Sequence, residues 1–359
     1  MTDKPTISIV VPVRNEALTL PSLLESLVEQ DFPPNAFEII VADGRSTDAT
    51  RALVLDFAAK SAVAVSLVDN PGIRSSAGRN AGVAAARGEF IVFIDGHCRI
   101  PSRNLLRSTV ALFQETRADC LCRPQPLLAP PGSWLGSVVA AARASTLGHG
   151  RDSLIYDMTA AGFVDPASSG ASYRRSVFSA IGVYDERFDA CEDVEFNTRV
   201  RKAGMLAYTD PRLAVYYEPR SSLRALLRQM VRYGRGRVRL MTKHPDTVSP
   251  MQLAPAALLA WIAAACVSLL LPVPAWVGLS LAAPVLLYGL ILAVASFWLS
   301  RAHGSKFFLP AIAVYGTIHL GLGAGLWIEL FSVGRGFALA RKPLGKSHVP
   351  QREARQERG

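Results

Sequence analysis

Three long apolar stretches near the carboxyl end constrain this chain more than any other feature. They cover residues 252–271, 275–299 and 307–331, and nearly all charged residues lie before Pro250 or after Phe331. A helix needs about 20 predominantly apolar residues to cross a bilayer, and each stretch meets that length. Buried helices of a soluble protein are the alternative, but three such segments in a row favour insertion into a membrane. We therefore expect a multi-pass membrane protein.

The amino-terminal part predicts a cytosolic location. Residues 1–5 are polar, and the apolar run 7–13 is too short for a signal peptide and lacks its flanks. The five cysteines are odd in number and lack CxxC spacing. This fits a reducing compartment and argues against a disulfide framework or a structural zinc site. We expect the first 250 residues to lie on the cytosolic side of the plasma membrane.

A basic amphipathic helix is expected directly before the first apolar stretch. Over residues 222–241, leucine and methionine recur on one side and arginine on the other. The arginines are Arg224, Arg228, Arg232, Arg235 and Arg239. Such a helix fits the headgroup layer of a membrane better than free solvent. The net charge of +10 therefore indicates membrane lipids or a phosphorylated substrate as partners, and no nucleic acid.

The amino-terminal part alternates two periodicities. Runs rich in β-branched residues cover 6–11, 37–41, 63–68 and 90–94, and the apolar residues between them recur at helical intervals. Continuous apolar strands separated by helices predict an α/β fold with a parallel sheet covered on both faces. In such sheets, ligands bind beyond the carboxyl ends of the strands. No GxGxxG follows a strand, so a dinucleotide fold has little support.

The sharpest candidate site is Asp95-Gly96-His97, which follows the fourth expected strand. A carboxylate and an imidazole two residues apart point the same way and can share one divalent ion that bridges diphosphate oxygens. Carboxylate is the more usual ligand of Mg²⁺, whereas imidazole binds Mn²⁺ more readily than Mg²⁺. The alternative is an aspartate that only caps a turn.

Two further clusters lie near expected strand ends. Asp43 ends the second strand, where its carboxylate can accept hydrogen bonds from a base or ribose, whereas Asp48 or Thr47 can simply cap the next helix. The segment GRNAG, residues 78–82, combines glycines that permit close backbone approach with the guanidinium of Arg79, which suits phosphate.

Glu192 and Asp193 are the candidates for acid–base chemistry. A hydroxyl that attacks opposite a departing diphosphate needs one base to take its proton. One carboxylate suffices, because a metal ion supports the leaving group. The alternative is that two acids at the start of a helix only complement its dipole.

Together, six motifs resemble the family 2 inverting glycosyltransferases, whose catalytic fold is called GT-A. In order they are SIVVPVRNE, VADGRSTDAT, GRNAG, GEFIVFIDGH, SGASYRRSVF and CEDVEF. The resemblance implies a GT-A mixed sheet with flanking helices, followed here by transmembrane helices. The Asp-Gly-His form with carboxyl-terminal membrane helices is most similar to succinoglycan-type exopolysaccharide transferases, which act on polyprenyl-diphosphate-linked sugars.

The resemblance also implies roles for individual residues. Asp95 and His97 would hold the metal, Asp43 would contact the base, and Asp193 beside Glu192 would be the catalytic base. The residues implied at the nucleotide-sugar site are Val11, Pro12, Val13, Glu16, Asp43, Arg79, Asp95 and Arg232.

Two positions depart from the family pattern. The usual pair of aspartates after the second strand is Asp43-Gly44 here, which leaves open which carboxylate holds the base. The usual second aspartate of the metal motif is His97, so both Mg²⁺ and Mn²⁺ stay open as the cofactor.

The resemblance and the hydropathy pattern imply four parts. These are a cytosolic GT-A domain over 1–220, a basic interface helix and linker over 221–250, a membrane domain over 251–335 and a disordered basic tail over 336–359. The chain would move a single sugar from a nucleotide diphosphate sugar, expected to be a UDP-sugar, to a polyprenyl-diphosphate-linked acceptor.

Two other functions compete with this one. A processive polysaccharide synthase would usually carry membrane helices before the catalytic part and a Gln-x-x-Arg-Trp element, whereas here Tyr233 follows Arg232. A membrane transporter or scaffold with a degenerate nucleotide-binding domain would be supported by loss of Asp95 or Asp193, and both are present.

The expected topology contains a conflict. Three crossings from a cytosolic domain put the tail outside, yet its basic residues favour the inside by the positive-inside rule. These residues are Arg335, Arg341, Lys342, Lys346, Arg352, Arg355 and Arg358. A third segment that is broken or re-entrant would resolve the conflict, and it contains Pro310, His319 and Glu329. The last two indicate contact with a lipid diphosphate or a neighbouring helix, or, for Glu329, a place at the interface.

Overall fold

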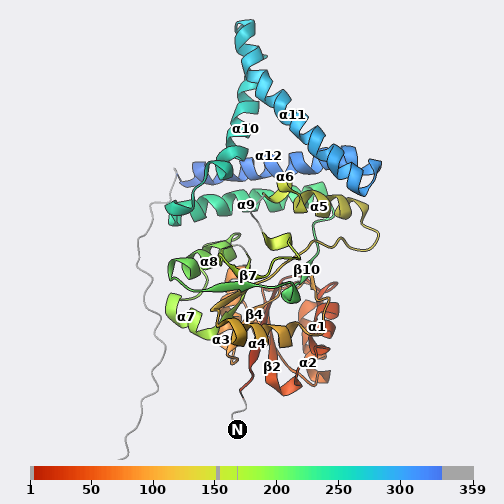
Figure 1. Ribbon diagram of the computed structural model, residues 1–359, viewed down its shortest axis with the longest axis vertical. Helices are drawn as coiled ribbons and strands as arrows, with labels where there is room; N and C mark the ends of the chain where they lie inside the picture. Colours follow the sequence, from red (N-terminus) through yellow and green to blue (C-terminus); the bar gives the residue numbers. More distant parts are fainter. Residues whose placement is uncertain (1–3, 151–153, 168, 334–359) are drawn as a thin grey trace, which may run out of the picture.

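The structure, a computed structural model, describes residues 4–150, 154–167 and 169–333. It has an α/β part, a layer of helices lying across that part, and a helical hairpin that rises from the layer (Figure 1). The tail expected over 336–359 lies outside the described residues.

The four expected strands form one side of the main sheet. They are β1 (Ile7–Val13), β2 (Phe37–Asp43), β3 (Ala64–Asp69) and β4 (Phe90–Phe93). All are parallel, in the order β3-β2-β1-β4. In the register of this sheet, Val13 lies opposite Asp43 and Asp43 opposite Asp69. The prediction of a parallel sheet is confirmed, and its carboxyl ends meet at one edge.

Four further strands, which run in both directions, complete the mixed sheet. They are β8 (Gly170–Arg174) beside β4, then β6 (Cys120–Cys122), β9 (Ala207–Thr209) and β7 (Gly162–Val164). A second, two-stranded sheet joins β5 (Cys98–Arg99) to β10 (Tyr216–Tyr217). The short apolar run of β6 lies between helices in the sequence, and its pairing with β8 and β9 decides its extended conformation.

Helices cover both faces of the main sheet, as predicted. One face packs against α1 (Leu20–Val28), α2 (Thr50–Lys60) and α4 (Leu105–Thr116). The other packs against α3 (Ser75–Ala85), α7 (Arg175–Ile181) and α8 (Glu192–Lys202). Helix α3 comes so close to β1 that a Cβ on Gly82 would overlap the side chain of Val10. Short 3-10 turns occupy Pro34–Ala36, Leu154–Tyr156, Pro211–Leu213, Pro245–Thr247 and Ser305–Phe307.

The helical layer contains the expected basic helix as α9 (Leu223–Lys243), with α5 (Trp134–Ala144) and α6 (Thr146–His149). Ser222 caps α9, since its hydroxyl accepts a hydrogen bond from the backbone nitrogen of Ala225 at 3.3 Å. One side of α9 meets the α/β part at the Ala190–Cys191 turn, where a Cβ on Gly236 would lie 2.5 Å from the Ala190 carbonyl oxygen.

The described residues contain three helices long and apolar enough to cross a membrane. They are α10 (Pro250–Ser268), α11 (Ala275–His303) and α12 (Phe308–Val333). The idea that the third is broken is wrong, because α12 is one continuous helix. Pro310 falls in its first turn, where a missing N–H removes no hydrogen bond within the helix.

Candidate active site

The loops after β1 and β2 are joined at the carboxyl edge of the sheet. Asn15 has the left-handed φ of +56°, which asparagine tolerates better than most residues. Its backbone nitrogen donates to the Ser46 hydroxyl at 2.8 Å, and its side-chain oxygen accepts from the Thr47 nitrogen at 2.8 Å. The Glu16 nitrogen donates to the Thr50 hydroxyl at 2.9 Å. These bonds hold Glu16 in a defined place beside the end of β4.

Arg79 connects two of the predicted acids. Its guanidinium donates to Asp95 at 3.1 Å and to Glu192 at 3.2 Å, and it lies over the rings of Phe93 and Tyr184. Burial acts to raise the pKa of Asp95, but the charge of Arg79 holds it below its ordinary value. For Glu192, burial prevails over Arg79 and the pKa is raised. Arg79 thus bridges the carboxylates of Asp95 and Glu192.

His97 leaves one ring nitrogen available. Its Nδ1 lies 3.0 Å from a carboxylate oxygen of Glu16, and its ring meets Tyr217 edge-on. Its Nε2 is buried and has no hydrogen-bond partner among the described residues. Histidines that bind metals typically donate their other ring N–H to a carboxylate, which fixes the tautomer. The site of Asp95 and His97 therefore fits a divalent ion, with Glu16 orienting the imidazole.

The protein offers few ligands for such an ion. Within the part of the chain that the structure describes, no group of three His, Cys, Asp or Glu side chains could hold a metal by itself. Asp95 and His97 would leave most coordination positions to other oxygens. This suits Mg²⁺ or Mn²⁺ ions, which in proteins are commonly held by one or two side chains plus substrate phosphates and water.

The two adjacent acids of the CEDVEF motif have different surroundings. Helix α8 begins at Glu192, as predicted, and is preceded by Cys191 with the left-handed φ of +62°, which is uncommon for a residue with a side chain. Glu192 is buried against Arg79, whereas Asp193 is exposed. One Asp193 oxygen accepts from the Val194 nitrogen at 2.8 Å. Of these two acids, only Asp193 presents its carboxylate to an incoming molecule.

Asp43 is fully buried at the end of β2. Its carboxylate accepts from the Ser46 nitrogen and pairs with Arg51 at 2.9 Å. Arg51 also pairs with Asp69, which ends the edge strand β3 and is exposed. A base that contacted Asp43 would have to share it with these groups. Sequence reasoning missed Arg51 and Asp69, although Asp69 directly follows the strand expected over 63–68.

The arginines of α9 do not all face solvent. Arg232 is 54% exposed, and its Nε lies 4.0 Å from Asp189. Arg235 and Arg239 instead pair with Glu329 of α12 at 2.8 and 2.7 Å. Part of the basic side of α9 is thus used within the protein, because Glu329 is buried and needs charged partners.

Two buried arginines were missed. Arg123 follows β6, whose carboxyl end lies at the same edge as that of β4, and its Nε and Nη1 have no partner among the described residues. Burial lowers its pKa, against the opposing charge of Asp95. Arg143 on α5 donates to the Tyr156 hydroxyl at 3.3 Å, while its Nη1 is likewise unpartnered. Recognising β6 as a strand would have pointed to Arg123.

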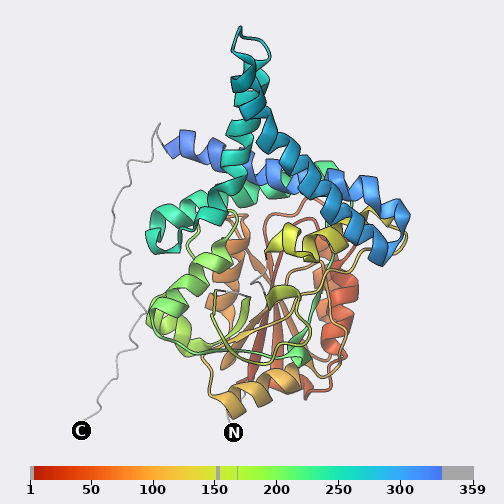
Figure 2. The ribbon, with the colours of Figure 1, turned by 45° about the horizontal axis from the view of Figure 1, so that its top comes forward.

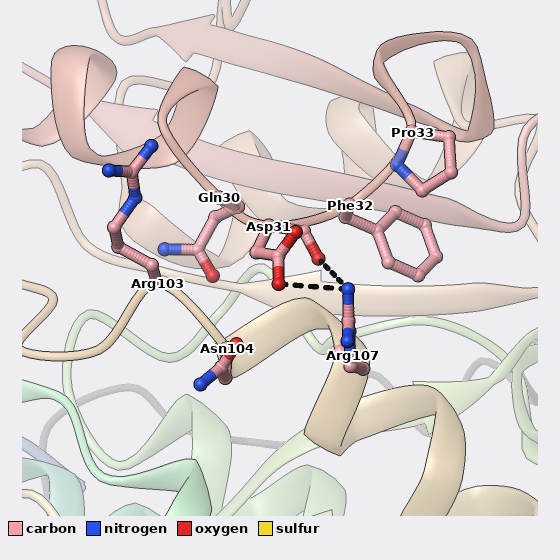
Figure 3. A pocket seen from close by; sticks show the side chains of 7 residues that line it. All are labelled: Gln30, Asp31, Phe32, Pro33, Arg103, Asn104 and Arg107. Atoms are coloured by element: carbon pink, nitrogen blue, oxygen red, sulfur yellow. Dashed lines mark hydrogen bonds and ion pairs between the residues drawn. The ribbon is translucent and has the colours of Figure 1, made fainter.

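A cavity lies away from these residues. It has a volume of about 730 Å³ and lies between the segment before β2 and the start of α4. Figure 3 shows Arg107 contacting Asp31 across it, with Arg103 and Phe32 at its sides. Since this is the amino-terminal edge of the sheet, the cavity contains none of the predicted site residues.

Comparisons with known proteins agree with these observations. Residues 8–182 match the family described as Glycosyl transferase family 2. The chain is 30% identical over 337 residues to the succinoglycan biosynthesis protein ExoA of Rhizobium meliloti (strain 1021), covering 91% of this chain and 96% of that protein.

A second relative comes from Methanococcus voltae. It is described as a dolichyl N-acetyl-alpha-D-glucosaminyl phosphate 3-beta-D-2,3-diacetamido-2,3-dideoxy-beta-D-glucuronosyltransferase, and is 24% identical over 64% of this chain and 71% of that protein. Among solved structures, the mannosyltransferase PcManGT from Pyrobaculum calidifontis, in complex with GDP-Man and Mn²⁺, has a TM-score of 0.57 at 20% identity. That likeness covers 92% of this chain and 88% of the other, and shows a common fold.

Proposed function

The chain belongs to the family 2 glycosyltransferases, and we propose that it moves a single sugar from a nucleotide diphosphate sugar to a lipid-linked acceptor at the cytosolic face of the plasma membrane. The catalytic domain would comprise residues 1–220, joined by residues 221–250 to a membrane part over 251–335. One observation carries the proposal: Arg79 hydrogen-bonds both Asp95 and Glu192. This joins the motif of His97, whose buried Nε2 has no partner among the described residues, to the helix start that carries the exposed Asp193.

The donor would bind at the carboxyl edge of the sheet, with Pro12 and Val13 lining the pocket. Asp95 and His97 would hold Mg²⁺ or Mn²⁺, which when bound offsets the charge that develops on the leaving diphosphate. The solved mannosyltransferase that shares the fold contains Mn²⁺ and GDP-Man, which supports this choice of ion and donor class. The proposed donor is a UDP-sugar, with Asp43 and Arg51 at the base and Arg232 near the diphosphate.

Three side chains have separate roles in the proposed reaction. Asp193 takes the proton from the acceptor hydroxyl as it attacks the sugar carbon opposite the diphosphate. Arg79 keeps Asp95 ionised and Glu192 in place. Glu16 holds the His97 ring with Nε2 directed away from the Glu16 carboxylate.

The proposed acceptor is a saccharide on polyprenyl diphosphate. Arg123 and Arg143 support an anionic acceptor, because each has buried guanidinium nitrogens without partners among the described residues, and such groups favour a bound anion. The apolar helices after residue 250 support a site beside lipid. The name of the Methanococcus voltae relative contains a dolichyl-linked substrate, which supports a lipid-linked acceptor.

Labelled nucleotide sugars test this function. We expect one donor, incubated with native membranes, purified protein and Mg²⁺ or Mn²⁺, to transfer label into the lipid extract. Without acceptor, the same donor should slowly release nucleoside diphosphate. Asp95→Asn protein is the control and should do neither. If no donor labelled the lipid extract and none released nucleoside diphosphate, the scaffold alternative would replace the proposed enzyme.

Replacing His97 with aspartate should retain transfer and shift metal preference toward Mg²⁺, because carboxylate is the harder ligand. The measurement is the ratio of initial rates in Mg²⁺ and Mn²⁺. Glu16→Gln is the matched control, since it keeps the imidazole but weakens its orientation. It should lower metal affinity about 10- to 100-fold without changing the preference. An unchanged preference in His97→Asp would exclude His97 as a ligand.

A further inference from the structure

Helix α12 follows α9 rather than the other two apolar helices. In Figure 1, α9 and α12 run side by side across the top of the α/β part, while α10 and α11 rise from them as a hairpin. Figure 2 shows the same arrangement after rotation, with α12 passing beneath the hairpin. The most apolar window of α12 is 33% buried within the protein, against 11% for α10 and 6% for α11. Helix α12 is thus covered by the rest of the protein more than α10 or α11 is.

Glycines bring α9 and α12 into backbone contact. A Cβ on Gly321 would lie 2.7 Å from the Cβ of Met230, and a Cβ on Gly325 would overlap the backbone carbonyl of Val231. From the other side, a Cβ on Gly234 would overlap the carbonyl of Leu322. Small residues at a helix crossing permit this close approach. The two helices therefore lie in one layer.

Two polar side chains tie the first half of α12 to the helical layer. The Tyr315 hydroxyl lies 2.8 Å from the hydroxyl of Ser145, at the junction of α5 and α6. The His319 ring lies 3.0 Å from the carbonyl oxygen of Leu147. Because α5 and α6 belong to the catalytic side, these bonds hold α12 against that side.

A buried ion-pair cluster ties the second half of α12 to α9. Glu329 is 3% exposed and accepts hydrogen bonds from Arg235 and Arg239. Arg239 also donates to the carbonyl oxygen of Arg187 in the α/β part at 3.0 Å. An α12 that left this layer would carry Glu329 away from Arg235 and Arg239 or pull these arginines with it.

The charged side chains of α9 indicate how deep α9 and α12 lie in a membrane. Arg224 and Arg228 are exposed, and Arg232 is half exposed. An arginine in the hydrocarbon core is costly unless it is paired or reaches the interface. A helix with these side chains, bonded to the α/β part, lies at the membrane surface, and α12 lies there with it.

We propose that only the α10–α11 hairpin crosses the bilayer and that α12 lies in the membrane interface beside α9. The 19 residues of α10 span about 28 Å at 1.5 Å per residue, close to a hydrocarbon core of about 30 Å. The exposed apolar side chains of α12, among them Leu309 and Phe331, face lipid. Two crossings put the basic tail on the same side as the catalytic domain, so the conflict with the positive-inside rule disappears.

Cysteine labelling in intact cells tests this topology in the full-length chain. The starting variant is Cys266→Ser, because Cys266 is exposed and the other four cysteines are buried. Single cysteines are then placed at Lys60 as the catalytic-side reference, at Leu270 in the hairpin turn, and after Gly359. A membrane-impermeant maleimide should label Leu270→Cys in intact cells, and the other two only after permeabilisation.

Each alternative has its own outcome. Labelling of the appended cysteine from the side of Leu270→Cys would mean three crossings. Labelling of Leu270→Cys from the side of Lys60→Cys would mean that the hairpin does not cross. Either result overturns the proposal, and neither depends on enzymatic activity, so failure of the proposed reaction would leave the test intact.

A matched pair of glycine variants tests the contact between α9 and α12. Gly325→Leu should lower the melting temperature of the detergent-purified protein by several degrees, because the side chain would displace backbone. Gly316→Leu on the same helix should have little effect, since a Cβ there meets nothing within 4 Å. Equal melting temperatures would show that α12 is not held against α9 and would overturn the proposal.

Discussion

Replacing Asp193 with asparagine should lower kcat for sugar transfer by about 10²- to 10⁴-fold, the usual contribution of a general base. Donor binding should stay nearly intact, because Asp193 is exposed and lies outside the contacts that hold Arg79 to Asp95 and Glu192. Asparagine keeps the shape of the side chain and can still accept the hydrogen bond from the Val194 nitrogen. The measurements are single-turnover transfer and donor affinity by calorimetry.

Glu192→Gln separates the two acids. Glutamine keeps an oxygen for Arg79 but removes a buried charge whose pKa is raised by burial. We expect a smaller loss of transfer than in Asp193→Asn, accompanied by a change in donor affinity. If Asp193→Asn kept most of its transfer while Glu192→Gln lost it, the base would be Glu192 and our assignment would be wrong.

Replacing Arg79 with methionine should destabilise the protein by about 3–5 kcal/mol, the usual cost of removing one partner of a buried ion pair. The substitution leaves Asp95 and Glu192 without their common partner, and the side chains of Arg79 and Glu192 are only 10% and 11% exposed. Donor binding should be lost as well, because the pKa of Asp95 would rise once the nearby charge is gone. Thermal unfolding and calorimetry measure the two effects.

A second substitution makes this prediction specific. Arg79→Met combined with Glu192→Gln should regain part of the stability, since one of the unpaired charges is removed. Lys60→Met is the control for losing a salt bridge as such, because Lys60 and Asp56 are 73% and 64% exposed and their pair contributes at most about 1 kcal/mol. If Arg79→Met lost no more stability than Lys60→Met, the ion pairs of Arg79 with Asp95 and Glu192 would not stabilise the fold as proposed.

Local patterns in the sequence predicted much of the fold and the chemistry. The strands before Asp43 and Asp95, the start of α8 at Glu192 and the apolar helices after residue 250 all lie where expected. Each depends on residues that are close in the chain: alternating or continuous apolar runs, acids in a first turn, and helix lengths that match a bilayer. Strand ends in a parallel sheet meet at one edge, so the position of the site follows from the same patterns.

Tertiary structure alone decided which side chains meet. Arg79 and Glu192 are 113 positions apart, Glu16 and His97 are 81 apart, and Arg235 and Glu329 are 94 apart. Periodicity identifies a buried face but not the charge that will be buried against it, because ion pairing depends on how separate elements pack. Hydropathy likewise indicates that α12 can enter lipid, whereas only the packing shows its close contact with α9, on which the proposed interfacial position rests. The sequence thus determined the elements and the chemistry they carry, and packing between distant elements decided their partners.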